Sequence, residues 1–347
     1  MSNKLVFKDV WRKNDAKAEQ DAIAAWQAAG MVPAGQNPMA RAKDLCAVAY
    51  DGDKLAAVSS IQVQPMQVVR EKMAFMRAYV LPEYREQNPV PQLSATVFEA
   101  ASKYAASHPN ERVGGVVGLM PQGVYVEKPV TEAGFVFSGF TPKNDRIFLR
   151  WFDHFRFANA GTGPAALTDE ATKDSKANVA KVTHKDVWLK NDAKVEQDAI
   201  AAWTAAGALP KSQDPMARAK EICVAAYEGK TLVGVSTATI EPMPIVRRKM
   251  VFFRLFVVPE HRHREIVIPL GMEVHKSAEK YALEHPELGL GGTAAVVVVK
   301  GIMSGPISRA HLTTVGYSQK SEPLILRWFD HYKFPKPQPA EAAQQAT

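Results

Sequence analysis

A dense basic segment, PEHRHREIVIPL, occupies residues 259–270. It follows the apolar run VFFRLFVV and leads into LGMEVHKSAEKYA, which has the apolar spacing of a helix. A strand, a basic turn and a helix N-terminus together favour phosphate binding, because the first backbone N–H groups of a helix are free to bind an anion. The segment contains Glu265 and no glycine, so two alternatives stay open: it binds an anionic cofactor, or it has lost that role. The segment PEYREQNPVPQL at residues 82–93 presents the same alternatives.

Few other residues have types and spacing that suit chemistry. Cys46 and Cys223 each lie in an apolar run, which favours buried free thiols over nucleophiles or a disulfide. The sequence RWFDH occurs twice, and we expect it on the last strand of each copy, where adjacent Asp and His side chains face opposite sides: Asp153 with His154, and Asp330 with His331. This geometry argues against an Asp–His dyad. The sequence has no cluster with metal-ligand spacing, no phosphate-binding P-loop and no usable Ser-His-Asp set, so we predict no metal site.

The two basic segments are related by an internal duplication. KDVWRKNDAKAEQDAIAAWQAAG begins at Lys8 and KDVWLKNDAKVEQDAIAAWTAAG begins at Lys185. The same offset relates Cys46 to Cys223 and needs no gap anywhere. We therefore predict one domain in two copies: copy one at residues 1–157, a flexible linker at residues 158–181, copy two at residues 182–334 and a disordered tail at residues 335–347.

Each copy has the pattern of a mixed α/β (α+β) domain. In copy two, NDAKVEQDAIAAWTAAG predicts a helix with Trp203 on its buried face, as Trp26 is in copy one, and ICVAAYEGKTLVGVSTATI predicts a hairpin. KMVFFRLFVV predicts a strand buried on both faces. A helix from about Ile268 to His285, a fifth strand over LGGTAAVVVV, a short helix ending at Gly316 and two final strands should follow. This order predicts a central, partly parallel sheet flanked by helices.

Composition narrows the classes of function. The chain has 347 residues, of which 46% are hydrophobic and 23% charged, as is typical of soluble globular domains. The apolar runs are too short to span a bilayer and the N-terminus lacks the apolar core of a signal peptide, so we expect a cytoplasmic protein with no membrane partner. The net charge of +7 is spread along the chain, which argues against nucleic acid as a main partner.

The element order, with V-x-P-E-x-R before a helix, resembles the GCN5-related N-acetyltransferase (GNAT) family in both copies. The strongest local features are FVVPEHRHREIVIPLGMEVHKSAEKYALEHP and YVLPEYREQNPVPQLSATVFEAASKYAASHP. The AAYEGKTLVGVSTA hairpin and the Gly316-Tyr317 and Gly139-Phe140 pairs support them. The resemblance implies tandem acyl-CoA N-acyltransferase-like domains, acetyl-CoA or another acyl-CoA as the cofactor, and acyl transfer to an amine of a small molecule or protein.

The family's pyrophosphate turn reads R/Q-x-x-G-x-G/A, because glycines let successive backbone N–H groups come close to the phosphates. Copy two has Glu265 and Val267 at the glycine positions, whereas copy one has Asn88 and Val90 with Pro89 between them. The resemblance implies these cofactor-binding positions: Val257, Val258, Arg262, His263, Arg264, Glu265, Ile266, Val267 and, in copy one, Arg85. For copy two a phosphate-binding cluster and a solvated turn are equally supported, and for copy one the solvated turn is favoured.

The family's frequent general acid is a tyrosine four residues before the Gly-Phe pair, and Leu312 and Phe135 occupy that position here. The adjacent His311 is therefore the candidate catalytic residue, with Ser304 and Ser308 as weaker candidates. The predicted fourth and fifth strands of copy two contain no carboxylate to serve as a general base. Arg254 and its counterpart Arg77 lie inside the apolar fourth strand, where we favour a structural ion pair over binding of a substrate carboxylate.

Three functions remain open from the sequence. The first is an acyl-CoA-dependent N-acyltransferase in which copy two performs any chemistry. The second is a non-catalytic tandem scaffold or assembly protein with a protein partner, because a fold does not carry its function with it. The third is a binder of CoA that performs no transfer.

Overall fold

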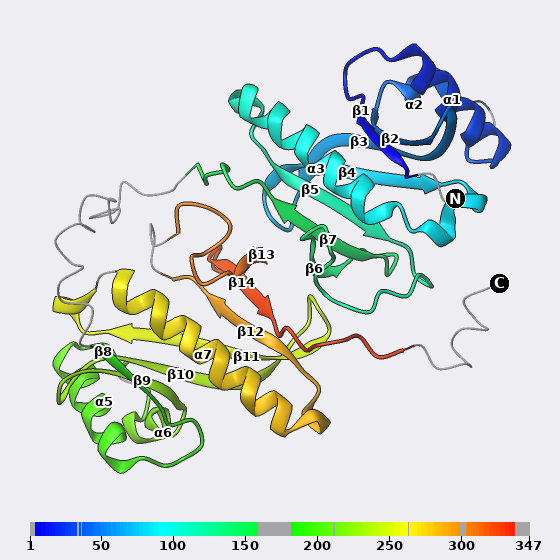
Figure 1. Cartoon of the computed structure of the whole chain (residues 1–347). Helices are drawn as coiled ribbons and strands as arrows, with labels where there is room; N and C mark the ends of the chain where they lie inside the picture. Colours follow the sequence, from blue (N-terminus) through cyan, green and yellow to red (C-terminus); the bar gives the residue numbers. More distant parts are fainter. Residues whose placement is uncertain are drawn as a thin grey trace. The chain divides into compact units, whose positions relative to one another are not determined.

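The computed structural model describes residues 4–32, 35, 37–158, 182–210, 212–262, 264–298 and 303–336. The chain forms two compact units: unit 1 is Met1–Phe155 with Lys333–Thr347, and unit 2 is Arg156–Tyr332 (Figure 1). Nearly all of the predicted linker and tail, residues 159–181 and 337–347, lies outside the described residues. In the part of the chain that the structure describes, no helix is long and apolar enough to cross a membrane.

The two units have the same succession of elements. Unit 1 contains β1 (Val6–Asp9), α1 (Ala16–Ala28), α2 (Pro38–Ala42), β2 (Leu45–Asp51), β3 (Lys54–Met66), β4 (Glu71–Val80), α3 (Val90–Ser107), β5 (Val113–Met120), β6 (Val136–Phe140) and β7 (Arg146–Trp151). Unit 2 contains β8 (Val182–Asp186), α5 (Ala193–Ala205), α6 (Pro215–Ala219), β9 (Ile222–Glu228), β10 (Thr231–Met243), β11 (Arg248–Val257), α7 (Arg264–Glu284), β12 (Leu290–Val296), β13 (Thr313–Tyr317) and β14 (Pro323–Trp328).

Each unit is built on a seven-stranded mixed sheet. The strand order is β1-β2-β3-β4-β5-β7-β6 in unit 1 and β13-β14-β12-β11-β10-β9-β8 in unit 2. All neighbouring strands are antiparallel except β4 with β5 and β11 with β12, which are parallel. The predicted fold class of tandem mixed domains, each with a partly parallel sheet flanked by helices, is confirmed.

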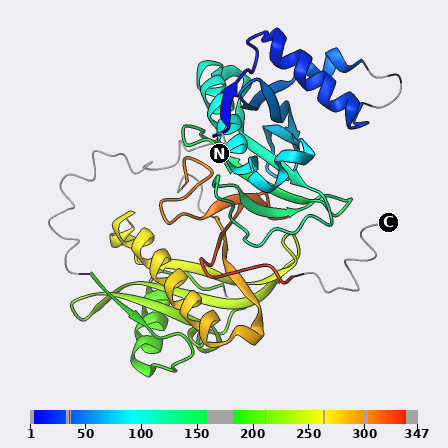
Figure 2. The same ribbon diagram turned by 45° about the vertical axis from the view of Figure 1, so that its right-hand side comes forward.

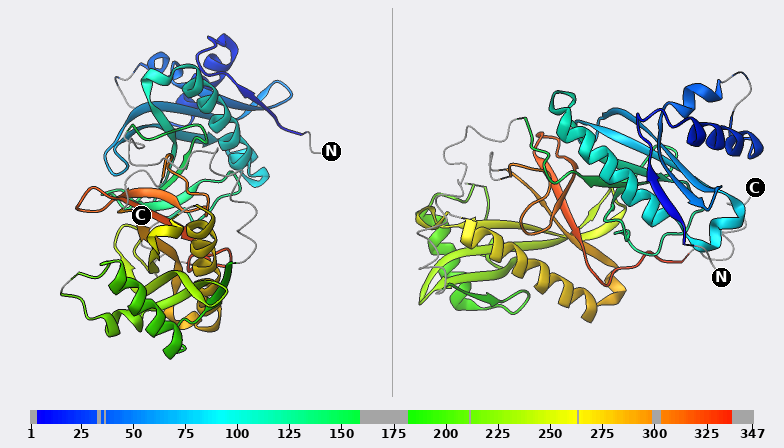
Figure 3. Two further views of the ribbon diagram at one scale, coloured as in Figure 1. Left: turned by 90° about the vertical axis from the view of Figure 1, so that its left-hand side faces the viewer. Right: turned by 45° about the horizontal axis from the view of Figure 1, so that its top comes forward.

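The apolar face of each helix decides which side of the sheet it covers. In unit 2, α7 packs Ile266, Leu270 and Val274 on one sheet face, whereas α5 packs Val195 and Trp203 on the other. In unit 1, α1 lies beside β2 and β3 (Figure 2). Trp26 of α1 is buried in the core cluster that these elements form. Figure 3 shows that α3 and α7 each lie along one face of their own sheet. The opposite face is covered by the two helices near the start of each copy, α1 and α2 in unit 1 and α5 and α6 in unit 2.

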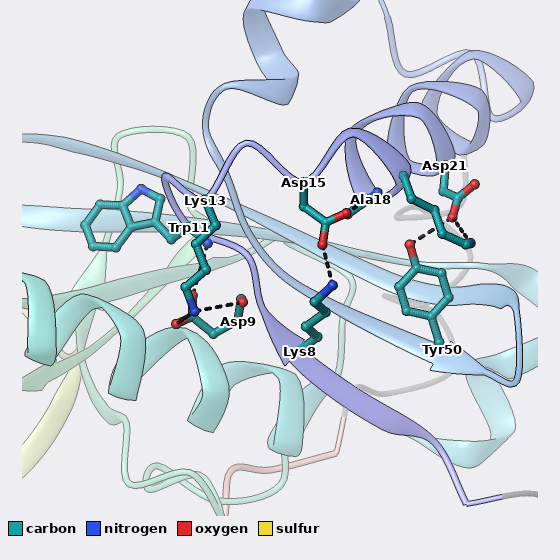
Figure 4. Close-up of polar contacts among 9 residues, drawn as sticks. Lys8, Asp9, Trp11, Lys13, Asp15, Ala18, Asp21 and Tyr50 are labelled. Carbon is teal, nitrogen blue, oxygen red and sulfur yellow. Dashed lines mark hydrogen bonds and ion pairs between the residues drawn. The ribbon is translucent and has the colours of Figure 1, made fainter.

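The start of α1 shows how the repeated sequence sets the local structure. Asp15 is the N-cap, and its side chain accepts a 3.1 Å hydrogen bond from the backbone N–H of Ala18 (Figure 4). Lys8 forms an ion pair with the same carboxylate, and together these contacts lower the pKa of Asp15. Asp192 caps α5 in the same way in unit 2. The duplicated N-D dipeptide therefore begins the first helix of each copy.

Two local predictions are wrong. The predicted short helix before Gly316 is instead a set of bends and a turn, with Ile307 bridged to Thr313. The Asp-His pair of RWFDH lies in a turn after the last strand, because β14 ends at Trp328. The prediction that β11 is buried on both faces holds for Val251, Phe253 and Phe256, whereas Arg254 of the same strand is exposed. The sequence interpretation also omitted the first strand of each copy, β1 and β8, and the short helices α2 and α6.

Unit 1 also includes Lys333 and Phe334. The backbone N–H of Phe334 donates to the carbonyl of Glu127 at 2.8 Å, and its ring lies 5.1 Å from that of Phe137 on β6. Phe334 is buried, so it is part of the core of unit 1. In unit 2, the half-buried Phe157 donates from its backbone N–H to the carbonyl of Ser304 at 3.1 Å.

Candidate functional site

The two parallel strands of unit 2 pair over only part of their length. Their aligned partners run from Lys249 with Leu290 to Phe252 with Ala294. Beyond Phe252, β11 continues to Val257 on its β10 side, but in the described residues this stretch has no partner on the β12 side. An open strand edge therefore lies directly before the turn that leads to α7.

An open edge and a helix start offer complementary groups. A strand edge presents alternating N–H and C=O groups, which can pair with an extended chain that carries amides. The first N–H groups of α7, from Arg264 onward, have no partner inside the helix and carry partial positive charge. The two features together suit an extended ligand with amides along its length and an anionic group at one end.

The structure brings several predicted cofactor residues to this place. Val257 ends β11 and is buried, and its carbonyl accepts a 3.2 Å hydrogen bond from Nε of Arg262. Val258 donates from its backbone N–H to the carbonyl of Val233 at 3.1 Å. Ile266 is buried in the core and Val267 packs against it, so their side chains anchor the first turn of α7. The side chains of Ile266 and Val267 are therefore turned into the core, and the backbone N–H groups of that turn are what it offers to an anion.

The remaining predicted residues of this segment contribute less to the described geometry. His263 lies outside the described residues, and Arg264 and Glu265 are placed only as the first two residues of α7. His261 lies 3.3 Å from the carboxylate of Glu228, so part of the basic cluster already faces a negative charge. The helix begins four residues before the predicted Ile268, which places Pro269 inside α7 rather than at its start.

The corresponding loop of unit 1 has fewer donors. The 3₁₀ turn Pro82–Gln87 ends at Asn88, whose backbone is in the left-handed region with φ 45°. The backbone N–H of Asn88 donates to the carbonyl of Arg85, and Arg85 itself is exposed. Pro89 and Pro91 flank the first residue of α3, and neither has a backbone N–H. The start of α3 is therefore poorly suited to a diphosphate.

His311 does not lie at this site. It is exposed in the turn before β13, with φ 61°, and its backbone N–H donates to the carbonyl of Ser308 at 2.9 Å. The same position in copy one is Gly134, with φ 75°. The strands β14 and β12 stand between β13 and β11, which separates His311 from the open edge. The weaker candidates Ser304 and Ser308 belong to the same irregular segment.

A buried histidine that the sequence interpretation missed lies between α7 and β12. His275 of α7 is buried, and its Nδ1 lies 2.9 Å from the hydroxyl of Thr293 on β12, whereas Nε2 has no partner among the described residues. Burial, helped by the nearby charge of Arg327, lowers the pKa of His275 to about 3. The signal was present in the duplication, because copy one has Phe98 at the position of His275 and Val116 at that of Thr293.

The last residues singled out from the sequence are the two thiols and the two arginines of the fourth strands. Cys46 and Cys223 are buried and free, and burial raises the pKa of Cys223 to about 12, so neither resembles an activated nucleophile. Arg77 and Arg254 are exposed, and no ion pair engages either of them within the described ranges. The predicted structural ion pair is therefore wrong. In the same ranges no three metal-ligating side chains come together.

The solved structures similar to this chain include acetyltransferases of the GNAT family. One, an acetyltransferase of the GNAT family from Streptococcus pneumoniae, is 12% identical, and the match covers 43% of this chain and 100% of that one, with a TM-score of 0.27. An aminoglycoside 6'-N-acetyltransferase complexed with coenzyme A is 10% identical, over 42% of this chain and 96% of that one, with a TM-score of 0.29. The resemblance predicted from the sequence agrees with these neighbours.

A third neighbour spans more of the chain. A GCN5-related N-acetyltransferase from Kribbella flavida is 16% identical, with a TM-score of 0.26, and the match covers 76% of this chain and 58% of that one. No protein-family model and no curated protein matches the chain. These likenesses concern the fold alone, so any function rests on the residues of the site.

Proposed function

We propose that copy two binds an acyl-CoA at the open edge of β11 and transfers the acyl group to an amine. The single observation that carries this proposal is the ending of the β11–β12 pairing at Phe252, directly before the start of α7. The amides of the CoA arm would pair with the strand edge, and its diphosphate would meet the first N–H groups of α7. Arg262 and the other basic residues of the segment add positive charge there.

The transfer itself would depend mainly on positioning. The amine nitrogen attacks the thioester carbonyl carbon, the carbon–sulfur bond breaks, and the CoA thiolate takes up the proton that the amine loses. Neither β11 nor β12 contains a carboxylate, and Leu312 stands where the family often has a tyrosine. The acceptor would therefore have to arrive as the neutral amine, and holding it beside the thioester would supply most of the rate.

A second function is favoured by specific observations. Nε of Arg262 already occupies the carbonyl of Val257, and His311 lies away from the open edge. Both features suit a non-catalytic tandem domain that serves as a scaffold for a protein partner. In that case the open edge of β11 would accept a strand of the partner in place of the CoA arm.

Calorimetric titration of acetyl-CoA into the intact chain, followed by a thiol-release assay with amines, separates these functions. Micromolar binding with release of CoA thiol on addition of an amine is the expected result. Binding without thiol release would select a CoA binder that performs no transfer. No binding at millimolar acetyl-CoA would leave the scaffold function.

A further inference from the structure

An arginine pair recurs at the same place in both copies, on the sheet face that α7 and α3 do not cover. In copy two the pair is Arg218 of α6 and Arg254 of β11. Residues alternate along a strand, so Arg254 shares its face with Phe256, which packs against α5. Phe253 and Val257, on the other face, pack under α7. The acyl-CoA proposal uses neither arginine.

Backbone hydrogen bonds bring the two arginines of copy two together. The carbonyl of Arg218 accepts a 3.1 Å hydrogen bond from the N–H of Glu221. The carbonyl of Glu221 accepts a 2.8 Å hydrogen bond from Ala238, the residue after Thr237. Thr237 is the cross-strand partner of Arg254 in the β10–β11 pair. The turn after α6 is therefore fixed beside the strand position of Arg254.

Copy one repeats this arrangement. The carbonyl of Arg41 accepts from Asp44 at 3.1 Å, and the carbonyl of Asp44 accepts from Ile61 at 2.8 Å. Ser60, the residue before Ile61, is the cross-strand partner of Arg77. The two copies, whose sequences differ at many positions, therefore have the same pair of arginines joined by equivalent backbone hydrogen bonds.

One guanidinium of each pair is held by a hydrogen bond and a tryptophan ring, while its Nε–H lacks an acceptor among the described residues. Nη1 of Arg218 donates to the side-chain oxygen of Gln213 at 3.2 Å, and the guanidinium lies 4.9 Å from the ring centre of Trp203. Arg41 likewise donates from Nη1 to the carbonyl of Met31 at 2.9 Å and lies 4.2 Å from Trp26. Nε is buried in both arginines and has no hydrogen-bond partner among the residues that the structure describes.

The charges at each pair favour an anion. Burial and then the charge of Arg254 lower the pKa of Arg218, and Arg77 acts in the same way on Arg41. The charge of Glu221 raises the pKa of Arg218 and so opposes this effect. The corresponding residue of copy one, Asp44, instead accepts a 2.7 Å hydrogen bond from the side-chain amide of Gln62. A buried N–H without an acceptor and two adjacent like charges are both unfavourable, and one bound oxyanion relieves both.

We propose that each arginine pair binds the carboxylate of a small organic acid. The edge formed by Nε and Nη2 of Arg218, or of Arg41 in copy one, is a fixed fork that matches the two carboxylate oxygens. The exposed Arg254, or Arg77, supplies the second positive charge from the neighbouring strand. The chain then carries two equivalent anion sites, one in each unit, on faces that α7 and α3 leave free.

Acetate titration followed through arginine Nε–Hε signals in ¹H–¹⁵N spectra of the intact chain tests this proposal. Arg41→Lys and Arg218→Lys identify the two signals. Acetate added at constant ionic strength should shift both along saturating curves, with chloride as the reference anion. Arg254→Gln should weaken acetate binding at Arg218 about tenfold or more and leave Arg41 unchanged, and Arg77→Gln should do the reverse. The exposed Arg309→Gln is the matched control and should change neither curve.

Three results would overturn the proposal. The first is a shift that rises linearly with acetate, as with chloride. The second is an unchanged midpoint for Arg218 in the folded Arg254→Gln protein. The third is saturation by inorganic phosphate but not by acetate, which would assign the pair to a tetrahedral anion. All three results are measured without acetyl-CoA, so they do not depend on whether copy two binds it at the open edge of β11.

Discussion

Copy one and copy two share their element order and strand order, but they have different side chains at one equivalent position of the core. Where copy one packs Phe98 against Phe152 and Phe135, copy two has His275 against Phe329, with its Nδ1 near the hydroxyl of Thr293. The fold therefore accommodates either an aromatic or a polar side chain at this core position. The loops before α3 and α7 differ in the same direction, since Pro89 and Pro91 have no backbone N–H at the start of α3, whereas the first residues of α7 are not prolines. Copy two has retained the polar chemistry, and copy one has the more apolar core.

The largest expected effect comes from Phe334, which follows β14 along the chain but belongs to unit 1. Phe334 is buried in unit 1, whereas Phe157 is only half-buried in unit 2. Phe334→Ala should lower the free energy of opening of β6 and β7 by about 3 kcal/mol, because a buried phenylalanine is replaced by a cavity. Native-state hydrogen exchange of the amides of β6 and β7 measures this change. Phe157→Ala is the comparison and should cost unit 2 less; equal losses would contradict the account.

The second effect is a pH dependence confined to copy two. The pKa of His275 falls from 6.5 to about 3 on folding, so the unfolded chain takes up the proton first as the pH drops. Stability is then fully present above pH 6.5 and is lost between pH 6.5 and pH 3, at about 1.4 kcal/mol per pH unit. Urea unfolding of unit 2 near pH 7.5 and near pH 5 measures this loss, which should reach about 2 kcal/mol.

The control for this pH dependence is the pair of residues found in copy one. The double variant His275→Phe with Thr293→Val should remove the extra loss of stability at low pH. It should also stabilise unit 2 near neutral pH, because the double variant no longer buries Nε2 of His275, which has no hydrogen-bond partner among the described residues. An unchanged pH dependence in the double variant would assign the loss to other groups.

The smallest expected effect concerns the charge at the start of α7. Glu265 is the second residue of the helix, where a negative side chain opposes the binding of an anion. Glu265→Gln should tighten acetyl-CoA binding roughly threefold, in keeping with about 0.3–1 kcal/mol for a charge near a helix end. Calorimetric titration gives the ratio of dissociation constants, and Glu284→Gln at the far end of α7 is the matched control. Weaker binding by Glu265→Gln would place the anion elsewhere.

Much of the fold could be predicted because its signals are local. The hairpin of β9 and β10 follows from two apolar runs around Gly229, which adopts φ 59° at the turn. The start of α7 was placed four residues late because the sequence predicts a basic turn before Ile268, whereas the helix begins at Arg264 and contains Pro269. The turn at His311 was taken for a helix because a histidine seldom adopts the left-handed backbone that the hairpin requires there.

The candidate site was less predictable, because its main features are not side chains. The open edge of β11 arises from a register that ends at Phe252, and no residue type marks that point. The burial of His275 depends on which elements pack together. So does the burial of Nε of Arg218, which finds no hydrogen-bond partner in the described part of the chain. Comparison of the two copies carried part of this information, since the exchange of Phe98 for His275 and the repeated arginines are both visible there.

Hydrogen–deuterium exchange of the intact chain with and without acetyl-CoA tests the central claim most directly. The claim is that copy two binds the cofactor at the open edge of β11 and the start of α7, and that copy one does not bind at its equivalent. Peptides that cover residues 253–268 should become protected, and peptides that cover residues 76–91 should not change. Protection in copy one, or in neither copy, would contradict the account.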